Sequence, residues 1–159
     1  MCKALYVGSF DPFTNGHLNV LDHASKIFDK VYICVMINPQ KKRLIDVTIS
    51  EMLIGQIIKK YNNVELVPAE TNLAYKQAKI YGCDYLVRGI RNNGLDYTYE
   101  ENYAELNKEI GDINTIFIRA DVNKNISSTM IRTLLENEED ISKYVPYSVF
   151  KYLTEREEW

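Results

Sequence analysis

The stretch "KALYVGSFDPFTNGHLNVLDHASKIF" (residues 3–28) decides the fold, because one polar loop in it joins two different hydrophobic periodicities. Residues 3–8 are an apolar run that predicts a short buried strand, and residues 17–28 have the spacing of an amphipathic helix. The loop from Gly8 to His17 holds two glycines, a proline, an aspartate, two hydroxyl groups and a histidine. We expect Gly8 to permit a sharp turn and His17 to lie in the first helical turn.

Outward from this unit, apolar runs and helix-period segments alternate along the rest of the chain. Further strands are predicted at residues 30–37, 64–68, 84–89 and 114–120. Further helices are predicted at residues 48–61, 72–82, 95–110, 127–139 and 147–157. Continuous apolar strands that alternate with helices indicate a parallel sheet covered on both faces. The predicted fold class is therefore α/β, a doubly wound five-stranded parallel sheet in one domain of residues 1–159.

Three local patterns refine the predicted helices. Thr48 and Glu51 have the spacing of a capping box, and Gly82 suits a helix C-cap. On the helix at 95–110, one face is polar and a neighbouring stripe is apolar and expected to pack on the sheet. The polar face, which could line a cleft or be solvated, contains Asp96, Glu100 and Asn107. The apolar stripe contains Leu95, Tyr99, Leu106 and Ile110.

Composition narrows the class of protein. The net charge of −3 disfavours a nucleic-acid-binding protein. The three cysteines, Cys2, Cys34 and Cys83, are widely spaced and form no zinc-binding pattern, so we interpret them as free thiols in a reducing compartment. No signal peptide and no apolar run of about 20 residues is present, so no membrane association and a cytoplasmic location are expected.

Chemistry-bearing residues follow four of the predicted strands. "GSFDPFTNGH" follows the first, "NPQKK" (38–42) the second, "RGIR" (88–91) the fourth, and "DVNKNISST" (121–129) the fifth. In doubly wound folds, ligands bind beyond the carboxyl ends of the strands. Glycines, helix N-termini and cations are the groups that hold phosphates. The sequence therefore predicts one phosphate-binding pocket at this edge, and no metal-ligating side chains are predicted in it.

These segments, together with "DYTYEENYAELN" (96–107) and "ISSTMIR" (126–132), resemble the nucleotidyltransferases that carry an (H/T)xGH signature. Within that group, "TNGH" (14–17) is similar to the TxGH form of the phosphopantetheine adenylyltransferases. The resemblance covers nearly the whole chain, in order. It implies a Rossmann-like nucleotidyltransferase fold and transfer of the adenylyl group of ATP to 4′-phosphopantetheine. The products would be dephospho-coenzyme A and pyrophosphate, formed without a covalent enzyme intermediate.

The resemblance also implies roles for individual residues. Catalysis would be carried by His17, Lys41 and Arg91, with Lys42 as a possible substitute for Lys41. ATP would be bound by Ser9, Phe10, His17, Gly89, Ile90, Arg91, Glu100, Asn123, Lys124, Asn125, Ile126, Ser127, Ser128 and Thr129. The acceptor would be bound by Ser9, Lys41, Leu73, Ala74, Arg88 and Asn107. Mg²⁺ would accompany ATP, bound mainly through phosphate oxygens and water.

The implied partners are ATP and 4′-phosphopantetheine, with coenzyme A feedback and a homo-oligomer, a hexamer by resemblance. Two alternatives stay open. One is an adenylyl- or cytidylyltransferase with another phosphorylated acceptor such as nicotinate mononucleotide, because "ISSTMIR" also resembles enzymes of that kind. The other is a nucleotide-binding sensor without catalysis.

Overall fold

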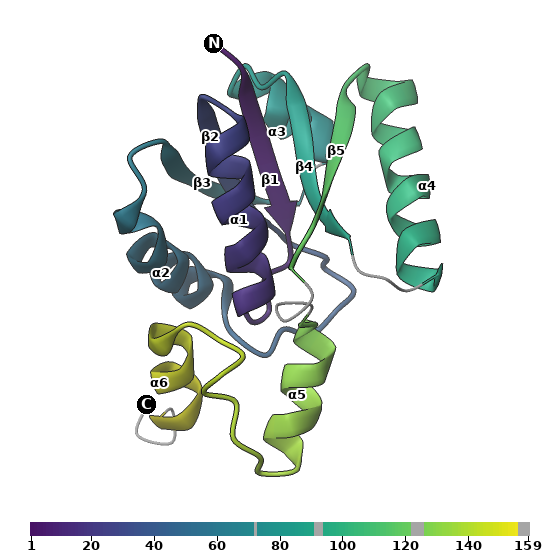
Figure 1. Ribbon diagram of the computed structural model, residues 1–159. Coiled ribbons are helices and arrows are strands. Elements are labelled where there is room, and N and C mark those ends of the chain that lie inside the picture. Colours follow the sequence, from purple (N-terminus) through teal and green to yellow (C-terminus); the bar gives the residue numbers. More distant parts are fainter. Residues whose placement is uncertain (72, 91–93, 122–125, 156–159) are drawn as a thin grey trace.

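A computed structural model describes residues 1–71, 73–90, 94–121 and 126–155, apart from the side chains of 94–97. Its centre is one sheet of five parallel strands in the order β3-β2-β1-β4-β5 (Figure 1). The strands are β1 (Lys3–Gly8), β2 (Lys30–Met36), β3 (Val64–Glu70), β4 (Tyr85–Ile90) and β5 (Asn114–Arg119). The predicted doubly wound α/β sheet is therefore confirmed, with strand ends within two residues of those predicted.

The helices connect the strands and cover both faces of the sheet. They are α1 (Asn15–Ile27), α2 (Val47–Ile57), α3 (Ala74–Ile80), α4 (Gly94–Gly111), α5 (Ser128–Glu136) and α6 (Tyr147–Glu155), with a 3₁₀ turn at Ile58–Lys60. Helices α1 and α2 contact one side, while α3 and α4 contact β4 from the other. Helices α5 and α6 lie beyond the carboxyl ends of the strands (Figure 1).

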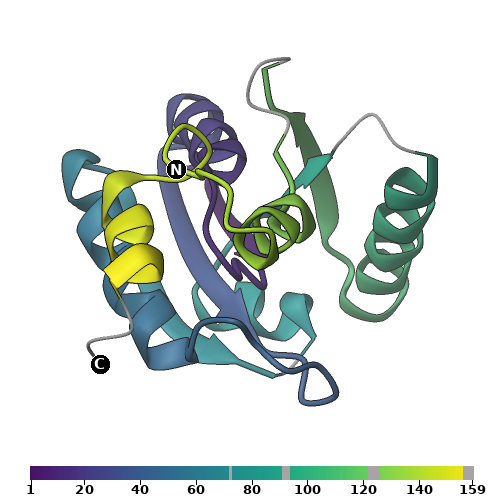
Figure 2. The same ribbon diagram turned by 90° about the horizontal axis from the view of Figure 1, so that it is seen from below.

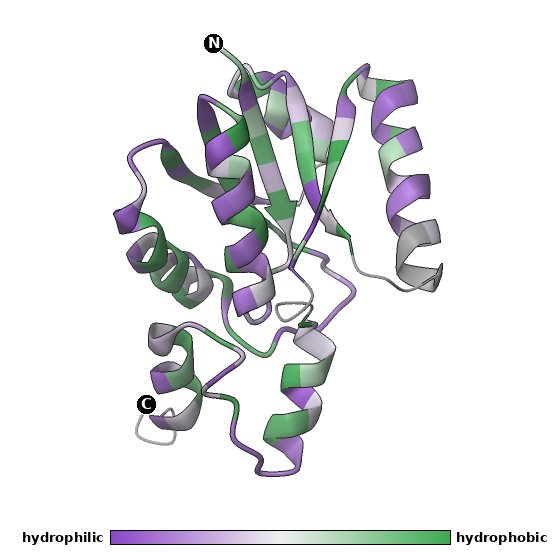
Figure 3. Ribbon diagram, in the orientation of Figure 1, coloured by the Kyte–Doolittle hydropathy of each residue, from purple (hydrophilic) through white to green (hydrophobic). Residues whose placement is uncertain are grey.

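Two apolar clusters form the core, one on each face of the sheet, as expected for strands whose side chains alternate between faces. On β1, Ala4 and Tyr6 belong to the cluster under α1 and α2, whereas Leu5 and Val7 belong to the cluster under α3. Figure 3 shows mainly hydrophobic colours on β1 and β4. Burial on both faces is why these strands read as continuous apolar runs.

The strand order reverses between β1 and β4. The chain proceeds from β1 outward to β2 and β3, then crosses back so that β4 pairs with the other edge of β1. The connections that follow β1 and β4 therefore run in opposite directions from neighbouring strands. Ligands bind at this switch point in such sheets. Seen along the strands in Figure 2, α5 lies over this point.

The predicted capping box of the second helix is wrong. Helix α2 begins one residue earlier than predicted, at Val47, and Asp46 is its N-cap, with its carboxylate accepting from the Thr48 amide. The Glu51 carboxylate instead accepts from the amide of Ala69 on β3, at 3.0 Å. Aspartate is a strongly preferred N-cap residue, and Asp46 directly precedes Val47, the first residue of the helix.

The predicted apolar stripe of α4 does not pack on the sheet. Tyr99, Leu106 and Ile110 are 63%, 39% and 51% exposed, respectively, and the fourth member, Leu95, lies outside the described side chains. The polar side chains of Glu100 and Asn107 are the buried ones. Periodicity identified two faces of this helix, but it could not show that the inner face is held by specific polar contacts.

The role expected for Gly8 also needs correction. The turn after β1 is made by Phe10, whose φ of 47° lies in the left-handed region. Gly8 instead allows close approach, because a Cβ there would lie 3.0 Å from two atoms of the Phe10 ring. Gly82 does have a positive φ, of 67°, and its amide donates to Lys79 after α3, as a C-cap glycine should.

Within the described part of the chain, none of the helices has the length and apolar content needed to cross a membrane.

Candidate active site

A cavity of about 580 Å³ opens at the switch point, between the segments that follow β1, β2, β4 and β5. Most of the described residues predicted for the site line it together. They are Ser9, Phe10, His17, Lys41, Leu73, Arg88, Gly89, Ile90, Glu100, Ile126, Ser128 and Thr129. These residues come from segments up to 120 positions apart, and the parallel sheet brings them to one edge.

His17 is held by the cap of α1. The Thr14 hydroxyl accepts from the His17 amide at 3.3 Å, and the Thr14 amide donates to Nδ1 of the His17 ring at 3.0 Å. Because Nδ1 accepts a hydrogen bond, the hydrogen of the neutral ring resides on Nε2. The arrangement presents His17 as a hydrogen-bond donor beside the N-terminus of a helix, which suits contact with a phosphate oxygen.

Asp11 ties the first loop to the segment before α2. Its carboxylate accepts from the amides of Leu44 and Ile45, at 2.7 and 2.8 Å. Two guanidinium groups stand close to the same carboxylate, those of Arg43 at 3.9 Å and Arg132 at 3.8 Å. This buried carboxylate is therefore a structural centre of the loop that carries Ser9 and Phe10, rather than an open ligand group.

Arg88 and Glu100 form a paired charge in the wall of the cavity. Arg88 donates to both oxygens of Glu100, at 2.8 and 2.7 Å, and to the carbonyl of Val7 at 3.0 Å. Its guanidinium also lies 5.4 Å from the centre of the Tyr103 ring. Burial alone would lower the pKa of Arg88, but the hydrogen bonds and charge of Glu100 outweigh burial and raise it. Arg88 is thus a fixed, permanent cation.

Lys41 reaches the cavity from an exposed loop. A turn closed by the Lys41 amide donating to the carbonyl of Asn38, at 3.1 Å, shapes this loop. The ammonium groups of Lys41 and Lys42 have no ion-pair partner among the described residues. Both line a smaller adjoining cavity of about 360 Å³, and Arg43 and Arg132 line it too, so positive charge surrounds that opening.

The start of α5 supplies amide groups to the cavity. Ser127 is the N-cap and accepts from the Met130 amide at 3.0 Å. The Ser128 hydroxyl donates to the carbonyl of Pro12 at 2.9 Å, which joins α5 to the first loop. Ser127 does not itself line the cavity, whereas Ser128 and Thr129 do. The free amides of a helix N-terminus favour an anion at this position.

Two further predicted residues lie outside the cavity lining. Ala74 is fully buried at the start of α3. The Asn107 carbonyl oxygen accepts from the amide of Tyr75 at 3.1 Å, and its amide nitrogen donates to the carbonyl of Tyr103 at 2.9 Å. Asn107 therefore joins α4 to the first turn of α3, and both sides of its amide group are engaged within the protein.

Four predicted residues lie outside the described part of the chain. They are Arg91, Asn123, Lys124 and Asn125. Tyr6, Tyr103 and Arg132 are among the lining residues that were not predicted as site residues. Arg132 ends the quoted motif "ISSTMIR", one helical turn after Ser128, and that spacing could have identified it. Tyr6 lies in an apolar run and Tyr103 in a segment of mixed polarity, and neither pattern indicates a binding residue.

Carboxylates near the cavity are already engaged. Asp11 is occupied by two amides and stands between two arginines, and Glu100 is paired with Arg88. Among the described residues there is no group of three or more metal-ligating side chains. The donor set therefore fits Mg²⁺ that is held through the oxygens of a bound polyphosphate and water, and not by a cage of side chains.

Comparisons with known proteins assign the family. The cytidylyltransferase-like family model matches residues 5–134. A phosphopantetheine adenylyltransferase of Streptococcus sanguinis is 37% identical over 151 residues, which is 94% of this chain and 92% of the relative. The enzyme of the same name from Streptococcus suis is 37% identical over 156 residues, 97% of this chain and 96% of its own length.

A solved structure from Vibrio parahaemolyticus supports the fold. That protein, provisionally named nicotinate-nucleotide adenylyltransferase, superposes with a TM-score of 0.67 over 97% of this chain and 99% of its own. At 23% sequence identity, this likeness speaks for the architecture alone. Identity over nearly the full length, together with the family model, shows that the chain belongs to the phosphopantetheine adenylyltransferase family of the cytidylyltransferase-like nucleotidyltransferases.

Proposed function

We propose that this chain transfers the adenylyl group of ATP to 4′-phosphopantetheine, giving dephospho-coenzyme A and pyrophosphate. The observation that carries the proposal is the single cavity, in which a histidine donor, an arginine, a lysine and a helix N-terminus surround one space. Such a set can align two polyanions and neutralise charge as bonds change. The chain's relatives bear the name of this enzyme.

The reaction needs no nucleophilic side chain. An oxygen of the acceptor's phosphate attacks the α-phosphorus of ATP, and the bond from that phosphorus to the bridging oxygen of pyrophosphate breaks. His17 donates from Nε2 to an oxygen on the α-phosphorus, where charge rises in the transition state. The Thr14 amide on Nδ1 keeps the ring in this orientation. His17 thus acts through hydrogen bonding and not as a nucleophile.

The acceptor lies on the Arg88 side of the cavity in this proposal. Three hydrogen bonds to Glu100 and Val7 fix the Arg88 guanidinium and leave two of its five N–H donors for a phosphate in the cavity that Arg88 lines. Lys41 lies between the two substrates and contacts the attacking phosphate and the reacting centre. Leu73 lines the same cavity and would contact the apolar part of the pantetheine arm.

The triphosphate of ATP lies at the N-terminus of α5. Ser128 and Thr129 line the cavity there, and the helix start supplies amide donors for the β- and γ-phosphates. Arg91 and residues 123–125 belong to the proposed ATP site through the family resemblance alone, since they lie outside the described residues. Phosphate oxygens and water, with no cage of protein side chains, would hold Mg²⁺ bound with ATP, and the ion would shield charge on the phosphates.

The proposal extends to assembly and location. The exposed side chains of Leu106 and Ile110 on α4 suit contact between copies of the chain, so we propose a homo-oligomer, a hexamer by family resemblance. Coenzyme A, which shares the pantetheine arm, is proposed as a feedback ligand of the same cavity. The three cysteines are free thiols, and we propose a cytoplasmic location, where thiols are kept reduced.

An acceptor assay tests the proposed function. Pyrophosphate release from ATP and Mg²⁺ is measured with 4′-phosphopantetheine, with nicotinate mononucleotide and with glycerol 3-phosphate. We expect turnover with 4′-phosphopantetheine and formation of dephospho-coenzyme A. Turnover only with another acceptor would replace the proposed substrate, and ATP binding without turnover on any acceptor would favour a nucleotide sensor.

A further inference from the structure

Tyr6 on β1 is a buried tyrosine whose hydroxyl the fold leaves unused. The residue is only 2% exposed, yet it lines the main cavity. Its ring packs edge-on against Phe10, with the ring centres 5.1 Å apart. Within the described part of the chain the hydroxyl has no hydrogen-bond partner, and none is among the influences on its ionisation. Among the described residues, the Tyr6 oxygen is not one of the fully buried polar atoms that lack a partner, so it is open to the cavity and within reach of a ligand bound there.

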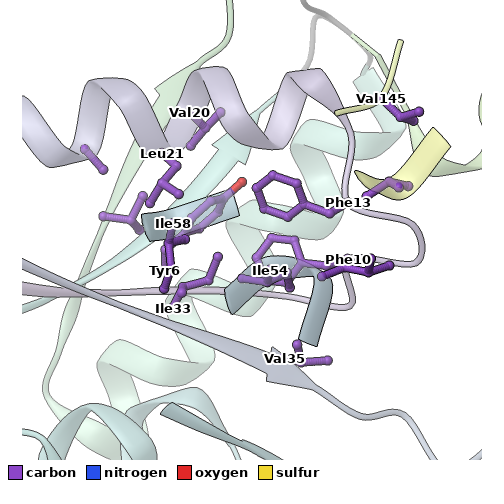
Figure 4. Packing of buried hydrophobic residues seen from close by; sticks show 14 of the residues in the cluster. Tyr6, Phe10, Phe13, Val20, Leu21, Ile33, Val35, Ile54, Ile58 and Val145 are labelled. Carbon is purple, nitrogen blue, oxygen red and sulfur yellow. The ribbon is translucent and has the colours of Figure 1, made fainter. Parts of the chain in front are cut away.

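The surroundings of the hydroxyl place it at the floor of the cavity. A Cβ on Gly89 would lie 4.0 Å from the Tyr6 oxygen and 3.2 Å from a methyl group of Val20. The oxygen therefore lies where β1, β4 and α1 meet. Figure 4 shows the Tyr6 ring near Phe10, with its oxygen directed toward the helix that carries Val20.

The hydroxyl is a donor under ordinary conditions. Burial raises the pKa of Tyr6 above its usual value, and the charge of Glu100 adds to this, while the charge of Arg88 opposes it. The phenol therefore keeps its proton at neutral pH. A protonated phenol can donate one hydrogen bond to an acceptor oxygen on a ligand.

The alternation of side chains along the strands tells which substrate Tyr6 faces. Val87 packs in the same core cluster as Tyr6, so position 89, two residues on, faces that side as well, whereas Arg88 faces the opposite side toward α4. His17 comes from α1, the helix that covers the Tyr6 face. In the proposed function His17 contacts ATP and Arg88 contacts the acceptor, and the family resemblance assigns Gly89 to the ATP side.

We propose that the Tyr6 hydroxyl donates a hydrogen bond to an oxygen of bound ATP and so makes Tyr6 a nucleotide-binding residue. This inference rests on the proposed function of the cavity. Binding of ATP gives the hydroxyl the partner that the unliganded protein lacks. The same bond contributes nothing to the stability of the unliganded fold.

Tyr6→Phe tests the proposal because it removes one oxygen and keeps the ring that packs on Phe10. We expect the KM for ATP to rise about threefold to tenfold, the value of one neutral hydrogen bond. The KM for 4′-phosphopantetheine should stay unchanged. The melting temperature of the unliganded protein should be equal or higher, while its increase on adding ATP should shrink.

Tyr85→Phe is the matched control. Tyr85 is on the adjacent strand β4, pairs in register with Ala4 and packs on Phe28, away from the cavity. This variant should leave both KM values as they are. An unchanged ATP KM in Tyr6→Phe, a rise confined to the acceptor, or a lower melting temperature without ligand would overturn the inference. If the wild type turns over no acceptor, calorimetric ATP binding by the two variants still decides the role of Tyr6.

Discussion

Arg88 and Lys41 line the same cavity, but the protein holds them in opposite ways. The Arg88 side chain is 18% exposed and is fixed by Glu100 and the carbonyl of Val7. Lys41 is exposed on a loop, and its ammonium group has no ion-pair partner among the described residues. Arg88 is therefore a buried cation held by protein contacts, whereas Lys41 is a solvent-exposed cation.

This difference shows that a cation of the site can affect both stability and function, or function alone. A buried cation must be paired, so losing either Arg88 or Glu100 alone would destabilise the fold as well as alter the site. An exposed lysine costs the fold almost nothing, and its charge matters only when phosphates arrive. His17 lies between these cases, since Thr14 orients it through a local cap. Substitutions should therefore separate stability from turnover in a graded way.

The largest effect is expected from breaking the buried pair. Glu100→Leu leaves the Arg88 guanidinium buried without its counter-charge, which should lower the free energy of unfolding by about 3–5 kcal/mol. The acceptor KM should also rise, because Arg88 is no longer held in place. Urea unfolding and steady-state kinetics measure the two effects.

A double variant sharpens this prediction. Arg88→Met combined with Glu100→Leu replaces the pair by apolar side chains of similar size, and should recover most of the lost stability. Acceptor turnover should stay low, since the cation is absent. A double variant as unstable as the single one would mean that packing, not charge pairing, makes this region stable.

The fold was largely predictable from sequence because its signal is repeated. Most strands contain a run of apolar residues and most helices have a helical apolar period, so errors at single residues did not change the topology. The placement of α4 was the failure. Its inner face is held by Glu100 and Asn107 through partners on β4 and α3, and such long-range pairing leaves no periodic trace.

The candidate site was predictable where motifs cluster at strand ends. His17, Lys41 and Arg88 line one cavity because parallel strands bring their carboxyl ends to one edge. Tyr6 and Tyr103 were missed because an aromatic residue in a strand or helix is usually core. The pairing of Arg88 with Glu100 was missed for a different reason, since both had been considered as ligand contacts and not as partners.

The next largest effect is expected at His17. His17→Ala removes the donor at Nε2 and should lower kcat about 10²–10³-fold, while ATP binding stays within about tenfold. His17→Asn is the matched variant, since its side-chain oxygen can take the place of Nδ1 and accept from the Thr14 amide. It should melt near the wild-type temperature and still lose turnover. Parallel losses of ATP affinity and kcat in both variants would point to a binding role.

The smallest of the three effects is expected at Lys41. Lys41→Ala should change the free energy of unfolding by less than about 0.5 kcal/mol, because the side chain is exposed on a loop. Loss of one charge-assisted contact to phosphate should lower kcat/KM about tenfold to a hundredfold. Lys42→Ala removes the same charge one residue along, from a side chain that lines only the smaller cavity, and should have a much weaker effect. If Lys42→Ala is the more damaging change, the loop presents its second lysine to the phosphates, and Lys41 holds the position of a solvated surface charge.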